Sequence, residues 1–296
     1  MIRPSLRQLE YLIAIEDEKS FLKAADKCGC TQSTLSAGIK ELENILRQPL
    51  VIRSRKHTTL TPLGAETVER ARKIISDTEL VVTRANLLKD PLSGPLRLGI
   101  IPTIAPYMLP DILPRLEKDF PKLELELHED LTDRLLEKMR IGQLDVALMA
   151  FPYDTPGMTQ HFLFEEPFYA ALPPHSSEHE KTINIKALDP DKLLLLEGEH
   201  CLRDHALLAC DIQTTSQRKT FSATSLATLI QMVRQGFGMT LLPEMACRPD
   251  VVPSDIRLMR FSDKHPPMRG IGLCWNAKTP RNRDYEALAG SIKHID

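Results

Sequence analysis

The sequence predicts an α/β protein in which a small helical module precedes a larger region of doubly wound α/β structure. Three observations predict it. Short amphipathic segments and a hairpin occupy the first 61 residues, one long amphipathic helix follows, and strands alternate with helices from residue 96 onward. With 296 residues, 42% of them hydrophobic and 26% charged, the chain has the composition of a folded protein with two or three domains.

The N-terminal module is expected to contain three short helices followed by a β-hairpin. Ser20 is placed to cap the second helix, Gly29 ends it, and Thr31 begins the third. Two strand-like segments, residues 50–53 and 58–61, surround a polar turn. This order predicts a helix-turn-helix with a wing.

A long helix is predicted to begin at Thr61-Pro62, with threonine as the N-cap and proline in the first turn. Its apolar positions alternate three and four residues apart, which is typical of a coiled-coil seam. The seam contains Val68, Ala71, Ile75, Thr78, Val82 and Ala85. We expect this linker helix to pair with a second copy. Packing against its own domain is the alternative.

The remaining residues read as alternating strands and helices. Strands are predicted at 96–101, 123–127, 145–149, 193–196, 239–242 and 271–275, and helices at 108–120, 133–141 and 226–235. Such alternation is typical of parallel α/β layers, in one or two doubly wound subdomains.

Composition narrows the function classes. The apolar runs are shorter than the roughly 18 residues of a membrane span, and the N-terminus lacks the apolar core of a secretory signal. We therefore expect a cytoplasmic protein without a membrane partner. Six cysteines are too few for a disulfide scaffold, and in the reducing cytoplasm they should be free thiols. Residues 1–90 carry 15 Lys and Arg against 12 Asp and Glu, a mildly basic module on an acidic body.

The turn at residues 24–36 carries the strongest local signal. Small residues precede it and short polar side chains open the next helix, as in a recognition helix that enters the major groove. The side chains expected to contact DNA are Gln32, Ser33, Thr34, Ser36 and Lys40 on that helix and Arg53 and Arg55 on the wing. The alternative is a small three-helix domain with a solvated polar face.

A second informative segment runs from His200 to Cys210. Cys201 follows His200 and precedes Arg203, a polar and electropositive setting that would lower the pKa of a thiol. Cys210 follows an apolar run. On spacing alone, two ordinary packed cysteines are the preferred interpretation. Cys28 and Cys30 lack a second ligand pair, so we predict neither a metal site nor a cofactor.

The N-terminal motifs resemble the LysR-type transcriptional regulators. The matching segments are residues 9–12, 21–25, 31–36, 39–43 and 60–64. The resemblance implies a winged helix-turn-helix over 1–62, a dimerising linker helix over 63–92 and an effector domain over 93–296. It further implies two α/β subdomains like those of periplasmic binding proteins, 93–165 with 266–296 and 166–265.

Residues 199–204 together with Cys210 resemble the redox motif of the hydrogen-peroxide-sensing members of this family, including the eight-residue interval between the cysteines. The resemblance implies that Cys201 is oxidised to a sulfenic acid and that Cys210 resolves it as a disulfide. The implied peroxide-binding residues are Thr103, Thr132, His200, Asp204 and Arg269. Without the resemblance, Thr103 and Thr132 would be helix caps and Arg269 a solvated strand end.

Ser225 precedes a predicted helix at a place where relatives in the family bind carboxylate effectors, although a plain helix cap fits equally well.

The resulting hypothesis is a peroxide-responsive transcription factor that binds double-stranded DNA as a homotetramer, a dimer of dimers, and contacts RNA polymerase. A regulator that senses a small metabolite between its subdomains is the alternative. A thiol peroxidase is disfavoured because it would leave the N-terminal module without a role. A helical 201–210 segment would hold the two cysteine Cα atoms about 13–14 Å apart, so the helix would have to unwind before a disulfide closed.

Overall fold

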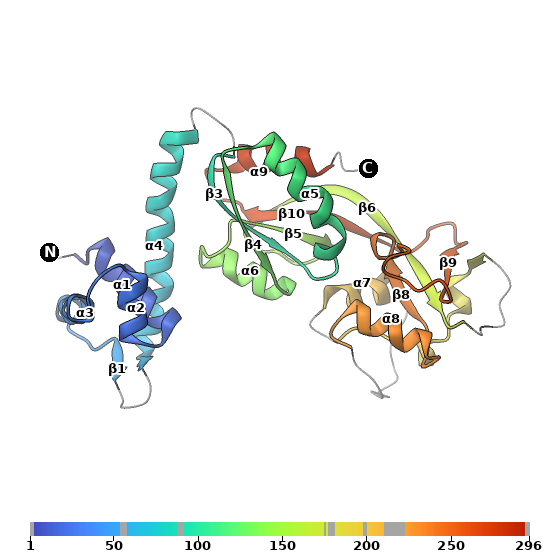
Figure 1. Cartoon of the computed structure of the whole chain (residues 1–296), viewed down its shortest axis with the longest axis horizontal. Helices are drawn as coiled ribbons and strands as arrows, with labels where there is room; N and C mark the ends of the chain where they lie inside the picture. The colour runs from blue at the N-terminus through green and yellow to red at the C-terminus, as the bar shows by residue number, and fades with distance from the viewer. Residues whose placement is uncertain are drawn as a thin grey trace. The chain divides into compact units, whose positions relative to one another are not determined.

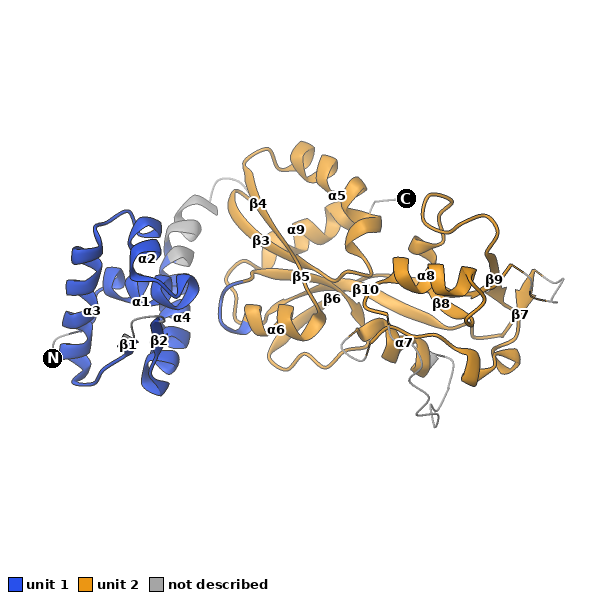
Figure 2. Cartoon of the chain, turned by 60° about the horizontal axis from the view of Figure 1, so that its bottom comes forward, with its two compact units in different colours: residues 1–89, 140–143 blue, residues 90–139, 144–296 orange. Residues whose placement is uncertain are grey.

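The computed structural model describes residues 3–53, 58–87, 92–174, 176, 181–197, 200–209 and 223–293. The chain divides into two compact units, residues 1–89 with 140–143 and residues 90–139 with 144–296 (Figure 2). Each unit has its own architecture and is described by itself.

The N-terminal unit consists of three short helices, a hairpin and one long helix (Figure 1). Its elements are α1 (Leu6–Glu18), α2 (Phe21–Lys27), α3 (Gln32–Leu46), β1 (Val51–Arg53), β2 (Thr58–Leu60) and α4 (Pro62–Leu87). The order agrees with the predicted helix-turn-helix, hairpin and long helix.

Short polar side chains begin these helices, as the sequence predicts. The hydroxyl of Ser20 accepts the amide of Lys23 at the start of α2, and Thr31 caps α3. The Thr61 hydroxyl accepts the amide of Gly64 at 3.0 Å, which caps α4. Gly29 ends the second helix with a φ of +61°, a conformation that glycine adopts without steric cost.

Close packing fixes the arrangement of this unit. A Cβ at Gly38 would lie only 2.7 Å from the ring of Tyr11, so α1 and α3 cross at a distance that only glycine permits. Gly64 is equally constrained, because a Cβ there would meet the carbonyl oxygen of Leu50 at 2.1 Å. The start of α4 is thereby held against the residue that leads into the hairpin.

The first part of the predicted linker seam lies inside this unit. Val68 and Ala71 are buried in a core shared with α1, and Ile75 packs against its edge. At these positions the helix packs against its own domain, which was the alternative interpretation. The side chains of Val82 and Ala85 lie outside the described residues, so pairing through the rest of the seam stays a prediction.

The second unit is a mixed sheet flanked by helices. Its strands are β3 (Gly94–Ile100), β4 (Leu123–Glu129), β5 (Val146–Phe151), β6 (Met158–Leu172), β7 (Thr182–Ile183), β8 (Thr240–Pro243), β9 (Arg257–Phe261) and β10 (Met268–Asn276). Its α-helices are α5 (Ala105–Asp119), α6 (Thr132–Arg140), α7 (Cys201–Ala209), α8 (Leu226–Arg234) and α9 (Asn282–Lys293).

The strand order is β4-β3-β5-β10-β6-β9-β7, with β8 also paired to β6. Strand β3 is parallel to β4 and β5, whereas β10 is antiparallel to both β5 and β6. The prediction of parallel layers is confirmed for β3, β4 and β5 and wrong for β6 and β10, because alternation along the chain does not reveal the direction of a strand that returns from the far end. The predicted strand 193–196 is also absent; only Leu193 and Leu196 form single bridges, to Met239 and Ala223.

Two hydrophobic cores divide this unit, and strand β6 joins them. One core lies around β3, β5, β10, α5 and α9, and the other around β8, β9 and α8. Strand β6 runs from the first half into the second (Figure 1). Helix α7 contributes to both cores, because Cys201 belongs to the first and Leu202 and Ala206 belong to the second.

Within the described part of the chain, the helices are all too short or too polar to span a membrane.

We predict that Val68→Ala destabilises the N-terminal unit by about 1–2.5 kcal/mol, because it removes buried methyl groups from the core that α1 and α4 share. Val81 on the same helix is 70% exposed and provides the matched control; Val81→Ala should change the unfolding free energy by no more than about 0.5 kcal/mol. Chemical denaturation of the full chain measures both values. Equal effects of the two substitutions would contradict the core assignment.

Candidate functional site

Cys201 is the first residue of α7 and its thiol is free. The side chain is only 6% exposed and packs into the first core of the effector unit. The chain thus places this thiol at a helix N-terminus and at the junction of two cores, away from bulk solvent.

Burial raises the pKa of the Cys201 thiol. The nearby hydroxyl of Thr132 and the charge of Arg269 oppose that shift, while the charge of Asp204 adds to it. The predicted lowering of this pKa by neighbours in the sequence is therefore wrong. Apolar surroundings outweigh the flanking polar residues once the chain has folded.

Thr132 faces this thiol from the start of α6. It is buried, and its hydroxyl has no hydrogen-bond partner of ordinary geometry among the described residues. A buried polar atom without a partner is costly unless a small molecule satisfies it. Thr132 is the first residue of α6 and its hydroxyl makes no capping hydrogen bond, so the helix-cap interpretation does not account for it.

Arg269 is fully buried on β10 and donates to three residues, Glu166, Thr103 and, through the sulfur at 3.7 Å, Met245. Its Nε donates to Glu166 Oε2 at 2.7 Å, and its Nη1 and Nη2 donate to the hydroxyl and carbonyl oxygens of Thr103 at 3.1 Å each. The interpretation of Arg269 as a solvated strand end is therefore wrong. The guanidinium carries a positive charge into the interior between the two cores.

Thr103 does not cap a helix. Helix α5 begins at Ala105, its N-cap is Ile104, and no side chain caps it. Thr103 is instead buried and uses both of its oxygens to hold Arg269. Because its hydroxyl oxygen accepts from Arg269, the hydroxyl hydrogen is available to donate to a third group.

Glu166 completes this network and was missed by sequence reasoning. It lies on β6 directly opposite Arg269 on β10, and its second oxygen accepts the amide of Met245 at 2.7 Å. Burial raises the pKa of Glu166, and Arg269 and the Met245 amide lower it again. Both oxygens act as acceptors, which fits the ionised form. Glu166 directly follows Glu165 in a strand that also contains Gln160 and His161, so its local sequence gave no signal that sets it apart.

His200 and Asp204 lie on either side of Cys201 in sequence but differ in environment. His200 is buried just before α7, and its carbonyl accepts the amide of Arg203 at 3.0 Å. Asp204 is exposed on the first turn of α7. The charge of Asp204 adds to the rise in the pKa of the Cys201 thiol.

Two further residues near the thiol were not predicted. Tyr153 donates to Asp133 at 2.7 Å, and its pKa is raised by burial and by that hydrogen bond, with smaller effects of Cys201 and Asp204. His205 lies one helical turn after Cys201, and its Nε2 is 2.7 Å from the carbonyl oxygen of Pro152. The i, i+4 spacing from Cys201 was the signal that could have identified it.

Ser225 caps α8, where its hydroxyl accepts the amide of Thr228 at 3.2 Å. The helix-cap interpretation of this residue therefore accounts for its contacts.

The remaining cysteines differ in environment from Cys201. Burial, with the charges of Glu166 and Glu244, raises the pKa of Cys247 to about 12, and burial raises that of Cys274 to about 11. Cys28 and Cys30 are half-buried free thiols at the turn before α3. Among the residues that the structure describes, no group of three or more His, Cys, Asp or Glu side chains is placed to hold a metal ion.

The outer face of α3 is polar. Gln32, Ser33, Thr34 and Lys40 are exposed and Ser36 is half-buried, whereas Leu35, Ile39 and Leu42 face the core. The Thr31 hydroxyl lies 2.8 Å from those of Ser33 and Thr34. This hydroxyl cluster orders the first turn of the helix.

Three predicted residues cannot be placed. Cys210 and Arg55 lie outside the described residues, and so does the side chain of Arg53.

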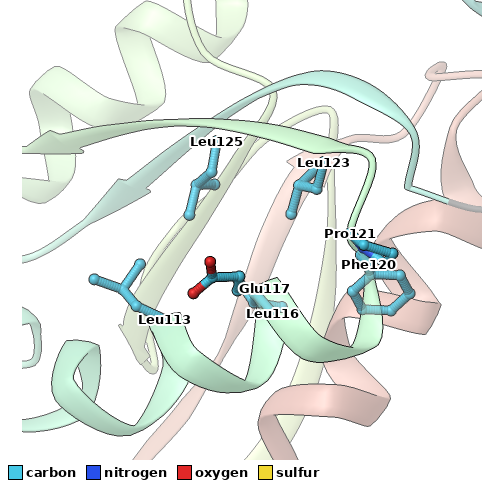
Figure 3. Close-up of a pocket in the computed structure, with 7 residues that line it drawn as sticks. All are labelled: Leu113, Leu116, Glu117, Phe120, Pro121, Leu123 and Leu125. Carbon is cyan, nitrogen blue, oxygen red and sulfur yellow. The ribbon is translucent and has the colours of Figure 1, made fainter.

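An apolar pocket lies elsewhere, between α5 and β4 (Figure 3). It is lined by Leu113, Leu116, Glu117, Phe120, Pro121, Leu123 and Leu125. None of these residues belongs to the cluster around Cys201.

Comparison with known families identifies both parts of the chain. Residues 6–65 match the bacterial regulatory helix-turn-helix proteins of the lysR family, and residues 89–294 match the LysR substrate binding domain. The chain belongs to the LysR family. It is a DNA-binding transcriptional regulator rather than an enzyme, built from a helix-turn-helix and an α/β effector domain.

The relatives of this LysR-family regulator match it over nearly its whole length. The transcriptional regulator EstR of Acinetobacter baylyi is 38% identical over 99% of this chain and 97% of its own. The dual regulator OxyR of Escherichia coli is 36% identical over 98% and 95%. A solved full-length OxyR variant from Pseudomonas aeruginosa is 33% identical, covers 99% of this chain and 96% of its own, and superposes with a TM-score of 0.81. The regulator is therefore similar to OxyR in sequence and in fold.

We predict that Glu166→Gln lowers the pH at which Cys201 becomes reactive by about 0.5–1 unit, since it removes the negative charge that balances Arg269. Glu165→Gln is the matched control, because Glu165 is the exposed neighbour on the same strand. The measurement is the rate of Cys201 alkylation against pH, followed by mass spectrometry of its peptide. Equal midpoints for the two variants would exclude a role for this pair in setting the thiol pKa.

Proposed function

We propose that this LysR-family regulator senses hydrogen peroxide through Cys201. The observation that supports the proposal most is the setting of the thiol at the start of α7, where the hydroxyl of Thr132 and the charge of Arg269 both oppose the rise in its pKa that burial causes. Similarity to OxyR, and to OxyR solved with bound hydrogen peroxide, supports it independently.

The proposed chemistry has two steps. The Cys201 thiolate attacks one oxygen of peroxide, the O–O bond breaks, and hydroxide leaves and takes a proton to become water, which yields a sulfenic acid. The Cys210 thiol then attacks that sulfur, the S–O bond breaks, and a second water leaves as the disulfide forms. Peroxide is reduced and the two cysteines are oxidised.

The surrounding residues are assigned roles in the first step. Arg269 favours the thiolate and the departing hydroxide through its charge, and Thr103 and Glu166 hold it in place. Thr132 donates a hydrogen bond to sulfur or to peroxide. His200 and Asp204 border the same space and complete the proposed peroxide-binding set.

The second step requires α7 to unwind. The helix includes all residues from Cys201 to Ala209, and eight rises of about 1.5 Å separate its ends by about 12 Å. A disulfide between residues 201 and 210 brings their Cα atoms to about 4.4–6.8 Å. Because α7 packs into both cores, its unwinding removes packing from each subdomain, which gives the oxidised protein a different effector domain.

We further infer that the protein acts in the cytoplasm and that the change in its effector domain reaches the DNA-binding helices through the arrangement of subunits in its oligomer. The proposed assembly is a homotetramer built from dimers that pair through α4, and it recruits RNA polymerase. The proposed DNA contacts are Gln32, Ser33, Thr34, Ser36 and Lys40 on α3, with Arg53 and Arg55 on the wing.

A second candidate is a regulator that responds to another small molecule between the subdomains. It is favoured by one observation: EstR, which is as similar to this chain as OxyR is, bears a name that makes no mention of peroxide. In this case the cysteines would be packing residues and Ser225 would border the effector.

We predict that stoichiometric peroxide changes the DNA footprint of the wild-type protein, whereas Cys201→Ser keeps the footprint of the reduced protein. The control is Cys274→Ser, because Cys274 is buried in the same core. Operators selected in vitro with reduced protein provide the DNA, and footprinting before and after peroxide gives the result.

A peroxide-dependent footprint that persists in Cys201→Ser would exclude Cys201 as the sensor. A wild-type footprint that does not change when peroxide is added would favour the small-molecule alternative.

A further inference from the structure

We propose that His205 is the latch that holds α7 against the first subdomain and that its protonation releases the helix. The inference deepens the proposed function and rests on it, because α7 is the segment that must unwind before the disulfide can form. His205 acts through α7 and is a positioning residue.

The latch is a single hydrogen bond across the two subdomains. His205 Nε2 lies 2.7 Å from the carbonyl oxygen of Pro152, the residue that directly follows β5. Since a carbonyl only accepts, Nε2 carries the proton and donates it. Leu202 and Ala206 on the same helix pack into the second core, so this bond ties that part of α7 to the residue that follows a strand of the first core.

The other ring nitrogen determines how the latch can fail. His205 is only 3% exposed, and its Nδ1 has no hydrogen-bond partner among the described residues. With Nε2 as the donor, Nδ1 is unprotonated, and its lone pair is buried without a hydrogen-bond donor among the described residues. Protonation at Nδ1 would create a buried cation whose new N–H has nothing to donate to, which the folded site resists strongly.

The charged and titratable groups around the ring do not offset that cost. Arg269 on β10 opposes a second positive charge, and only Asp204, which is exposed on α7 itself, favours one. Tyr153, which follows Pro152, and Cys201 on the preceding turn are the other titratable groups nearby, and both are neutral at pH 7. Burial is the main reason why the pKa of His205 is lowered.

The direction in which pH changes the docking of α7 follows from the difference between the pKa of His205 in the docked helix and in the released helix. A histidine released from the site titrates at about pH 6.5, whereas the docked imidazole stays neutral to lower pH. The released form therefore binds the extra proton, and docking of α7 weakens as pH falls below about 6.5, by up to about tenfold per pH unit, until the docked imidazole itself titrates. Above pH 7 the latch is at full strength.

A fall in pH should therefore affect the two steps of the proposed switch in opposite directions. Acid disfavours the thiolate of Cys201 and so slows the attack on peroxide, but it promotes the unwinding that disulfide closure needs. The latch also keeps Cys201 enclosed in the absence of peroxide.

Hydrogen exchange of the reduced full-length protein, without peroxide, tests the latch directly. The readout is the protection of amides in residues 201–209, corrected for the intrinsic effect of pH, between pH 7.5 and 5.5. Wild-type protection should fall below pH 6.5. His205→Gln keeps an amide N–H that reaches Pro152 but cannot titrate, so it should retain protection at both pH values. His205→Leu loses the donor and should reduce protection about 3–10-fold at pH 7.5.

The control is His161→Gln, because His161 on β6 stacks on Trp275 of β10, and it should behave as the wild type. A wild-type helix whose protection does not change with pH, or a His205→Gln variant that keeps the wild-type pH dependence, would overturn the proposal. The first of these outcomes does not depend on any variant folding. Failure of peroxide sensing would instead appear as absence of a disulfide with the exchange pattern intact, so the two claims fail separately.

Discussion

The structure depends on one constraint, which is that helix α7 belongs to both hydrophobic cores of the effector domain. Its first residue, Cys201, packs into one core and Leu202 and Ala206 pack into the other. A change of covalent structure at the start of this helix cannot stay local, because the helix cannot unwind without taking packing from both halves. The thiol proposed to react and the joint between the two cores therefore lie on the same helix.

The surroundings of the thiol favour its protonated form in the absence of a stimulus. Burial raises the pKa of Cys201, and the nearby Arg269 is already paired with Glu166 and hydrogen-bonded to Thr103. A buried ion pair of this kind contributes little net stability, but it fixes where the charge lies. A protonated, enclosed thiol beside a pre-positioned cation suits a group that reacts rarely and on a specific stimulus.

Whether the sequence could predict a feature depended on how far apart along the chain the interacting residues lie. Helix starts at Ser20, Thr31 and Thr61 were predictable because a cap is a contact over three residues. The pair of Glu166 with Arg269 joins residues 103 positions apart on antiparallel strands, and no local pattern reveals that pairing. The pKa of Cys201 was mispredicted for the same reason, since its sequence neighbours are polar while its spatial neighbours are the core.

The most direct test of the account is mass spectrometric mapping of the cysteine peptides after one equivalent of peroxide is added to the reduced protein. The account predicts a single new disulfide that joins residue 201 to residue 210, with Cys247 and Cys274 still thiols. Recovery of Cys201 and Cys210 as free thiols, with peroxide consumed elsewhere or not at all, would contradict it.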